Sequence, residues 1–126
     1  IEESLIRRLN NASIYYNELN LISDLVLPPR IDGYKNIHNF FVIRTDKRNE
    51  LSEYLFLKGI ETKVHYPIPI HLQPAAKFLQ YKKGSFKQAE KQAKRILSLP
   101  INQFLKEKFP AITFLSKYSG CSFKYK

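Results

Sequence analysis

The stretch from residue 64 to residue 74, Val-His-Tyr-Pro-Ile-Pro-Ile-His-Leu-Gln-Pro, contains prolines at positions 67, 69 and 74. Proline fixes φ and lacks an amide donor, so the stretch predicts an extended, polyproline-like path rather than a helix or a central strand. Such a backbone presents side chains at fixed distances at little entropic cost, which suits a ligand pocket. The alternative is a connector whose polar groups face water. The candidate residues on it are His65, Tyr66, His71 and Gln73.

Upstream of this stretch, apolar residues recur first at helical and then at strand spacing. The uncapped first helix ends before Pro28, and Thr45 or Asp46 can cap the second, which ends at Gly59. His38 opens the strand between them and is interpreted as a structural histidine. The predicted elements are a helix over 2–20 with Leu5, Ile6, Leu9, Ala12, Tyr16 and Leu19 on one face, a strand from 36 to 44 buried on both faces, a helix carrying Leu51 to Lys58, and a short strand over 61–64.

Downstream, the pattern predicts a short helix, a longer helix, a strand and a final helix. Ser85 with Gln88 three residues later is typical of a capping box for the longer helix. Together the elements predict an α+β fold with a small, largely antiparallel sheet and helices packed on one side. The elements are a helix over 74–81, a helix from 85 to about 96, and a strand over 97–100 closed by proline.

The composition limits the classes of protein and of partner that are compatible with this chain. The 126 residues form one domain, and no apolar run is long enough to span a bilayer. One cysteine, Cys121, fits a reducing compartment, and we expect a cytoplasmic protein. The net charge of +10 is compatible with nucleic acid, an anionic small molecule or a membrane surface. Its densest run, from Lys77 to Arg95, has helical spacing, which favours a solvated helix face.

Two sharper interpretations are disfavoured by the residues themselves. A metal site at His65 and His71 lacks a nearby cysteine or carboxylate, and a six-residue spacing across prolines does not put both rings on one face. A nucleic-acid stacking surface is conceivable from eight tyrosines and nine phenylalanines. Most of these aromatics, however, occupy apolar positions of predicted elements, where a core role is the simpler explanation.

The order of residues resembles the C-terminal domain of the DegT/StrS-type sugar aminotransferases. The resemblance covers about the first hundred residues, and its most specific part is the sequence from His65 to Pro69. The residues that carry it are Arg8, Ala12, Tyr16, His38, Phe40, Arg48, Leu51, Leu55, Gly59 to Thr62, His65 to Pro69, His71, Gln73, Gly84, Phe86, Ala89, Glu90 and Leu97 to Pro100.

The resemblance implies a pyridoxal phosphate-dependent enzyme that moves an amino group, usually from glutamate, onto a keto-sugar linked to a nucleoside diphosphate. It places the cofactor and its Schiff-base lysine in a preceding large domain. We therefore expect no catalytic, cofactor-binding or metal residue in this chain, and an isolated chain that is inactive and binds no pyridoxal phosphate.

By the same analogy, His65, Tyr66 and His71 contact the nucleotide-sugar, with Gln73 a weaker choice. The expected assembly is a homodimer, without nucleic acid or membrane partners. A stand-alone basic nucleic-acid-binding module and a non-catalytic association domain are the alternative functions.

The two ends of the chain carry expectations of their own. A start at Ile1 inside a helix, together with the absence of methionine, predicts a piece of a longer protein. The recognisable domain is expected over 1–105. Residues 106–126 form an atypical tail, because Phe109-Pro110 interrupts any helix there; a frameshift and natural divergence both remain open. Lys87 stands where the family commonly has proline.

Overall fold

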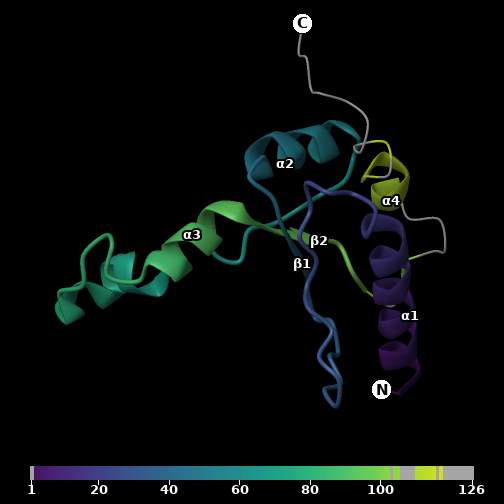
Figure 1. Cartoon of the computed structure of the whole chain (residues 1–126), viewed down its shortest axis with the longest axis horizontal. Coiled ribbons are helices and arrows are strands. Elements are labelled where there is room, and N and C mark those ends of the chain that lie inside the picture. The colour runs from purple at the N-terminus through teal and green to yellow at the C-terminus, as the bar shows by residue number, and fades with distance from the viewer. Residues whose placement is uncertain (1, 103, 106–109, 116, 118–126) are drawn as a thin grey trace, which may run out of the picture.

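The computed structural model describes residues 2–102, 104–105, 110–115 and 117, so Cys121 and most of the predicted tail lie outside the described residues. The α+β class is confirmed. The chain forms a body and an arm that projects from it (Figure 1). We define the arm as residues 66–95. The elements in chain order are α1 (Glu2–Leu19), β1 (Phe41–Arg44), α2 (Arg48–Leu57), the 3-10 helices η1 (Ile70–Leu72) and η2 (Pro74–Leu79), α3 (Lys87–Arg95), β2 (Ile96–Leu99) and α4 (Pro110–Leu115).

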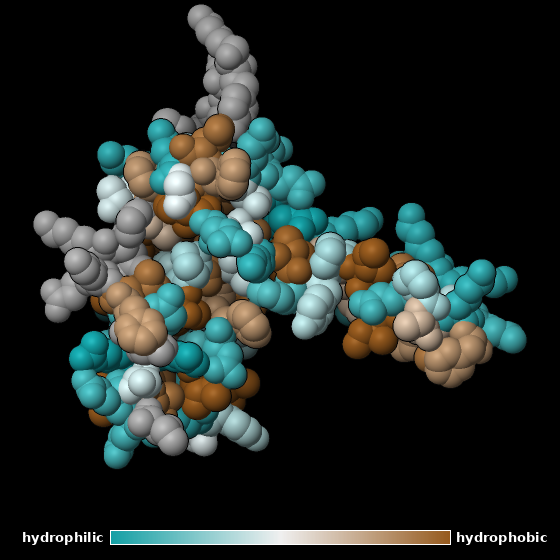
Figure 2. Space-filling view, turned by 180° about the vertical axis from the view of Figure 1, so that it is seen from behind, coloured by the Kyte–Doolittle hydropathy of each residue, from teal (hydrophilic) through white to brown (hydrophobic). Residues whose placement is uncertain are grey.

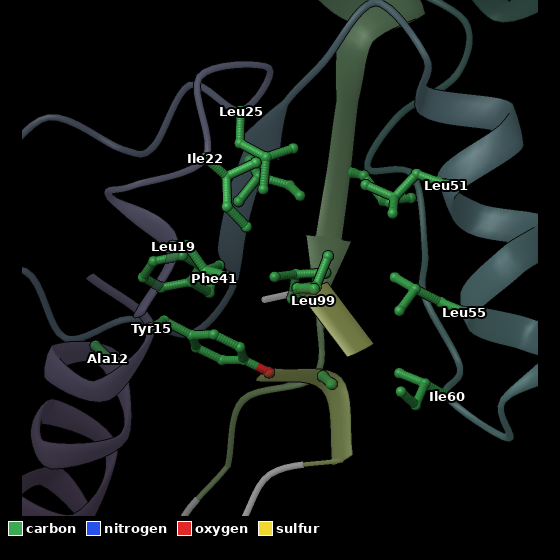
Figure 3. Packing of buried hydrophobic residues seen from close by; sticks show 14 residues of the cluster. Ala12, Tyr15, Leu19, Ile22, Leu25, Phe41, Leu51, Leu55, Ile60 and Leu99 are labelled. Carbon is green, nitrogen blue, oxygen red and sulfur yellow. The ribbon is translucent and has the colours of Figure 1, made fainter. Parts of the chain in front are cut away.

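The sheet consists of β1 and β2, which pair antiparallel with Phe41 opposite Leu99 and Ile43 opposite Leu97. Because paired residues point to the same face, these four apolar side chains share one side of the sheet. Side chains from α1 and α2 converge on that side (Figure 3). Helices α1 and α2 therefore cover one face of the sheet, as predicted, whereas η1, η2 and α3 lie in the arm. The core cluster comprises Ala12, Tyr15, Leu19, Ile22, Leu25, Phe41, Ile43, Leu51, Leu55, Ile60, Leu97, Leu99, Ala111 and Leu115.

The first helix has its predicted bounds to within one residue, but its buried face is turned slightly from the predicted one. Tyr15 is fully buried, whereas Ile6 is half exposed. The Tyr15 ring stacks on Phe41 with centroids 4.7 Å apart, and its hydroxyl donates to the Pro100 carbonyl at 2.7 Å. Burial raises the pKa of the Tyr15 phenol. Tyr15 thus packs in the core and also satisfies the carbonyl of Pro100, the residue that follows β2.

The two strands predicted upstream of the arm differ from the structure. The strand predicted from residue 36 begins only at Phe41, because His38 has a left-handed φ of +48° that no strand accommodates. The strand predicted over 61–64 is wrong: only Lys63 forms a bridge, antiparallel to Ser98. On the opposite edge of the sheet, Val26 makes a single bridge to Arg44. The apolar run predicts a strand buried on both faces, whereas Val42 and Arg44 are only half-buried.

The predicted capping box at Ser85 and Gln88 is also wrong. The α3 N-cap is Phe86, without a side-chain cap bond, and the Ser85 hydroxyl accepts from Lys82 N instead. The side chain that reaches back over this helix start is Glu90, which accepts from Gly84 N and Phe86 N. At α2, Thr45 Oγ1 accepts from Lys47 N, one residue before the helix begins.

Pro110 begins α4 rather than preventing a helix. Proline is tolerated at the first helical position because the amide it lacks has no intrahelical partner there. Ala111 and Leu115 of this helix are buried in the core, and α4 contacts α1. The predicted break at Phe109-Pro110 is therefore a helix start at residue 110.

Gly59 ends α2 in a Schellman motif, and its replacement is the first test of the fold. Gly59 N donates to Phe56 O, Ile60 N donates to Leu55 O, and Gly59 has φ +76°. Among the described residues no atom lies within 4 Å of an added Cβ, so the expected cost of Gly59→Ala is conformational, about 1 kcal/mol. Urea unfolding measures it. Gly59→Asn, which tolerates this conformation better, should cost less; equal costs would contradict the assignment.

Candidate functional site

His65 is held at the point where the arm leaves the body. Its Nδ1 lies 2.9 Å from Ser98 Oγ in β2, and its ring lies 4.4 Å from the Phe40 ring, centroid to centroid. The Lys63–Ser98 bridge fixes the backbone two residues earlier. These contacts orient the imidazole at the edge of a pocket of about 430 Å³ on the body, which Asn39, Phe40, Lys63 and Ser98 also line.

Tyr66 is the first residue of the arm and lies in an apolar groove there. The groove has a volume of about 480 Å³ and runs between the proline segment, which we define as residues 64–74, and α3. Apolar side chains gather on the arm in the space-filling view (Figure 2). Tyr66 itself is 67% exposed, so its ring face is available for packing on a ligand. The groove lining comprises Tyr66, Ile68, Pro69, Ile70, His71, Leu79, Tyr81, Phe86, Ala89, Gln92, Ala93 and Ile96.

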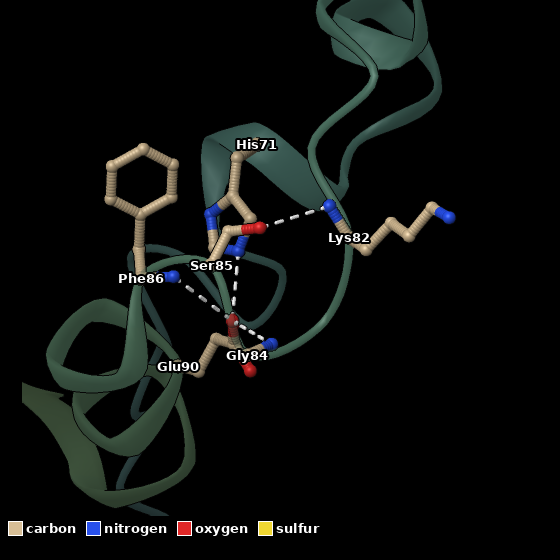
Figure 4. A network of polar contacts seen from close by, with 6 residues as sticks. All are labelled: His71, Lys82, Gly84, Ser85, Phe86 and Glu90. Atoms are coloured by element: carbon tan, nitrogen blue, oxygen red, sulfur yellow. Dashed lines mark hydrogen bonds and ion pairs between the residues drawn. The ribbon is translucent and has the colours of Figure 1, made fainter.

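His71 is buried, and its ring nitrogen is already bonded. Nε2 lies 3.0 Å from Glu90 Oε1, and the ring packs on Phe86 with centroids 4.8 Å apart. The same carboxylate oxygen accepts from Gly84 N at 2.7 Å and from Phe86 N at 3.4 Å (Figure 4). One carboxylate thus joins η1, the 81–86 loop and the start of α3. This network shapes the groove wall.

Protonation of Glu90 is expected to weaken the arm. Burial alone would raise the pKa of this carboxyl, but the hydrogen bonds from Gly84, His71 and Phe86 outweigh it and hold the pKa below its ordinary value of 4.5. A depressed folded-state pKa contributes stability above the unfolded pKa, and that contribution is lost as the pH falls through the folded value.

The test compares thermal unfolding of the parent chain and Glu90→Gln at pH 7 and below pH 4.5. The parent should lose more stability between the two than the variant, because the variant has no carboxyl to protonate. Glu90→Ala, which also removes the acceptor oxygen, should be less stable than Glu90→Gln at pH 7. Identical pH profiles of parent and Glu90→Gln would contradict the network.

Gln73 lies outside the groove, in a separate pocket of the arm. Its Nε2 donates to Ile68 O at 3.1 Å, which closes the proline segment on itself, and it lines this pocket of about 420 Å³ together with Tyr66. The extended path predicted for residues 64–74 is interrupted by η1, although Pro69 and Gln73 on either side keep extended ψ angles of 146° and 147°. Tyr66 thus lines one pocket with His71 and another with Gln73, while His65 lines the body pocket.

The described residues contain no group of three or more His, Cys, Asp or Glu side chains that could hold a metal ion. None of the described helices combines the length and apolarity that a membrane crossing requires. His38 is buried, and its ring packs against Tyr16 and Phe41.

Comparison with known proteins places this geometry in a family. A family model of the DegT/DnrJ/EryC1/StrS aminotransferases matches residues 1–109, which include the whole arm, both strands and all the lining residues of the pocket around His65 except Ala111.

The chain belongs to the DegT/DnrJ/EryC1/StrS aminotransferase family. It is 43% identical over 103 residues to the pleiotropic regulatory protein of Geobacillus stearothermophilus, covering 80% of this chain and 28% of that protein. It is 36% identical over 99 residues to the dTDP-3-amino-3,4,6-trideoxy-alpha-D-glucose transaminase of Streptomyces venezuelae, covering 79% of this chain and 26% of that enzyme.

Among solved structures, the fold matches S. venezuelae DesV in complex with a ketimine intermediate. The TM-score is 0.88 at 30% sequence identity, over 95% of this chain and 33% of DesV. The resemblance to the C-terminal domain of DegT/StrS-type aminotransferases is thereby confirmed. The chain spans between a quarter and a third of the length of these relatives.

Sequence reasoning missed two partners of its candidate residues in this DegT-family chain. Ser98 bonds His65 from a distant strand, and Glu90 bonds His71 from the following helix. A carboxylate in the first turn of α3 was a usable signal for Glu90, because glutamate there can reach back to open amides. The roles of His65, Tyr66, His71 and Gln73 towards a ligand stay predictions.

Proposed function

We propose that this chain is the C-terminal part of a cytoplasmic, pyridoxal phosphate-dependent aminotransferase that transfers an amino group from glutamate to a nucleotide-linked keto-sugar. The observation that carries the proposal is the family match over residues 1–109. The name of the S. venezuelae transaminase, which specifies a dTDP-linked amino sugar, supports the substrate class. In this proposal the chain supplies substrate and dimer contacts.

His65 and Tyr66 are the side chains best suited to contact the nucleotide-sugar. When Ser98 donates to Nδ1, the proton of the neutral His65 ring is on Nε2, which can donate to a sugar or diphosphate oxygen. The exposed Tyr66 ring offers a face for a sugar or base and a hydroxyl for a polar group. Both lie where the arm joins the body, so one ligand could reach them together.

His71 and Gln73 complete the proposed set at its margins. The His71 ring is 7% exposed and bonded to Glu90, so the proposal gives it chiefly the task of positioning the groove wall. Gln73 fixes the carbonyl of Ile68 and holds the proline segment in shape.

Pyridoxal phosphate does not fit the described residues on their own. A Schiff-base lysine works in an enclosed site where its amine is desolvated, but every described lysine is exposed. When bound, the cofactor supplies the carbonyl that accepts and returns the amino group. We therefore place the cofactor and its lysine in parts of the protein beyond the described residues. No step of the amino transfer on the cofactor is assigned to the described residues.

Binding can be tested with dTDP-glucose and UDP-N-acetylglucosamine as probes on the complete protein that contains this chain. We expect saturable shifts of the His65 ring resonances and of Tyr66, because both would contact the ligand. The His71 ring should shift less, since Glu90 holds it. If neither probe moves His65 or Tyr66, the proposed contact site is wrong.

A further inference from the structure

A second pocket lies on the body between α1 and the loop over residues 29–38. It has a volume of about 390 Å³ and shares no residue with the body pocket at His65 or with the arm groove. Helix α1 forms one wall of this pocket, and the largely exposed loop forms the other. The pocket is lined by Leu9, Ala12, Ser13, Tyr16, Pro29, Arg30, Ile31, Tyr34, Lys35, Asn36 and His38.

The lining of this loop pocket is cationic. Arg30 and Lys35 contribute two positive charges, and no carboxylate is among the lining residues; Asp32 belongs to the same loop but does not line the pocket. Within the described part of the chain, no ion pair joins Arg30 or Lys35 to a carboxylate. The Arg30 guanidinium lies 4.0 Å from the centroid of the Tyr16 ring, which holds it at the pocket.

His38 adds an unsatisfied polar atom to the same wall. The residue is 7% exposed, and its Nδ1 is a buried atom without a hydrogen-bond partner among the described residues. Its backbone amide donates to Asn36 Oδ1, and its ring packs against Tyr16 and Phe41. Buried polar groups are normally bonded, so an orphaned ring nitrogen beside a cationic pocket indicates a missing partner.

We propose that the loop pocket formed by Arg30, Lys35 and His38 binds an organic phosphate. A phosphate oxygen would accept from the Arg30 guanidinium and from the His38 ring, once a local rearrangement exposes the buried Nδ1. Lys35 would contribute a further positive charge at the rim.

The size and walls of the pocket favour a phosphate carried on a larger body over the bare ion. A volume near 390 Å³ is in the range of small-molecule sites and well above what one inorganic phosphate fills. Tyr16, Tyr34, Pro29 and Ile31 offer aromatic and apolar surface for a ring or a base. This ligand would bind apart from the nucleotide-sugar contacts at His65 and Tyr66, so the inference does not rest on the proposed function.

Calorimetric titration of the full chain with UMP and glucose 1-phosphate tests the inference, with uridine and glucose as uncharged counterparts. We expect both phosphates to bind and both neutral molecules to bind at least about tenfold more weakly. Arg30→Gln should weaken phosphate binding about tenfold or more. Arg7→Gln is the matched control, because it removes the same charge from an exposed position on α1 outside the pocket. Lys35→Gln, at an exposed residue, gives a second variant should Arg30→Gln misfold.

The three histidines report the location of binding. With UMP, the ring resonance of His38 should shift while those of His65 and His71 stay in place, which separates this site from the proposed nucleotide-sugar contacts. Equal weakening by Arg30→Gln and Arg7→Gln would show non-specific attraction and overturn the proposal. An unmoved His38 resonance at saturating UMP would overturn it as well. Inorganic phosphate that binds as tightly as UMP would refute the part played by the organic body.

Discussion

Phe41→Ala is expected to destabilise the chain by about 3–5 kcal/mol, a large fraction of the total stability of an ordinary domain. Phe41 is fully buried, and its ring contacts Tyr15 at 4.7 Å and Tyr16 at 5.1 Å between centroids. It also pairs with Leu99 across the sheet. The substitution leaves a cavity where α1 meets both strands, and the surrounding elements can fill it only in part.

Urea unfolding followed by circular dichroism measures this effect, and Phe56→Ala is the matched control. Phe56 is a phenylalanine on α2 that is 73% exposed, so its truncation should change the free energy of unfolding by less than about 0.5 kcal/mol. Similar losses for the two variants would mean that the sheet face with Phe41 is not the centre of the core.

Tyr66→Ala is expected to raise KM for a nucleotide-linked sugar by roughly 10- to 100-fold in the complete protein, because a desolvated aromatic contact is commonly worth about 1.4–3 kcal/mol. Tyr66→Phe, which keeps the ring and loses the hydroxyl, should have a smaller effect. The comparison therefore separates stacking from hydrogen bonding at this residue.

Phe78→Ala is the control for this second prediction. Phe78 is an exposed aromatic on the same arm, in η2, and it lines neither the groove nor the pocket at His65. It should leave KM within about twofold of the parent value. Equal effects of Tyr66→Ala and Phe78→Ala would indicate general damage to the arm rather than a lost contact.

Elements with strong local signals could be predicted from the sequence. The spacing of three and four in α1, the glycine at the end of α2 and the apolar run before Pro100 each indicate nearly the observed bounds. These signals act within one or two turns of chain, so local sequence suffices to predict them.

Elements whose form depends on distant partners could not be predicted. Residues 61–64 have strand-like composition, but only Lys63 finds a bridging partner before the chain turns into the arm. The residue that satisfies the open amides at α3 is Glu90 rather than Ser85, because Glu90 is also bonded by His71 from η1. The start of α4 at Pro110 could not be predicted for a related reason. A proline can either end or start a helix, depending on the residues after it and the surface on which they pack.

The location of the candidate site could be predicted from the sequence, but only some of the contacts of its residues could. The prolines of residues 64–74 pointed to a rigid segment with polar side chains, and the segment does separate the two pockets at the arm junction. The division of its residues was not predictable, since it depends on long-range contacts of His65 with Ser98 and of His71 with Glu90. The loop pocket at His38 could not be predicted at all, because a histidine before an apolar run is typical of a core position.

Amino transfer by the complete protein is the most direct test of the proposed function. Purified protein would be supplied with glutamate and a series of dTDP- and UDP-linked keto-sugars, and formation of the amino sugar would be followed together with that of 2-oxoglutarate. We expect equimolar formation of both products with at least one sugar, and a loss of this activity in Tyr66→Ala that Phe78→Ala does not share. A protein that binds pyridoxal phosphate and yet transfers no amino group to any sugar of the series would contradict the proposed function.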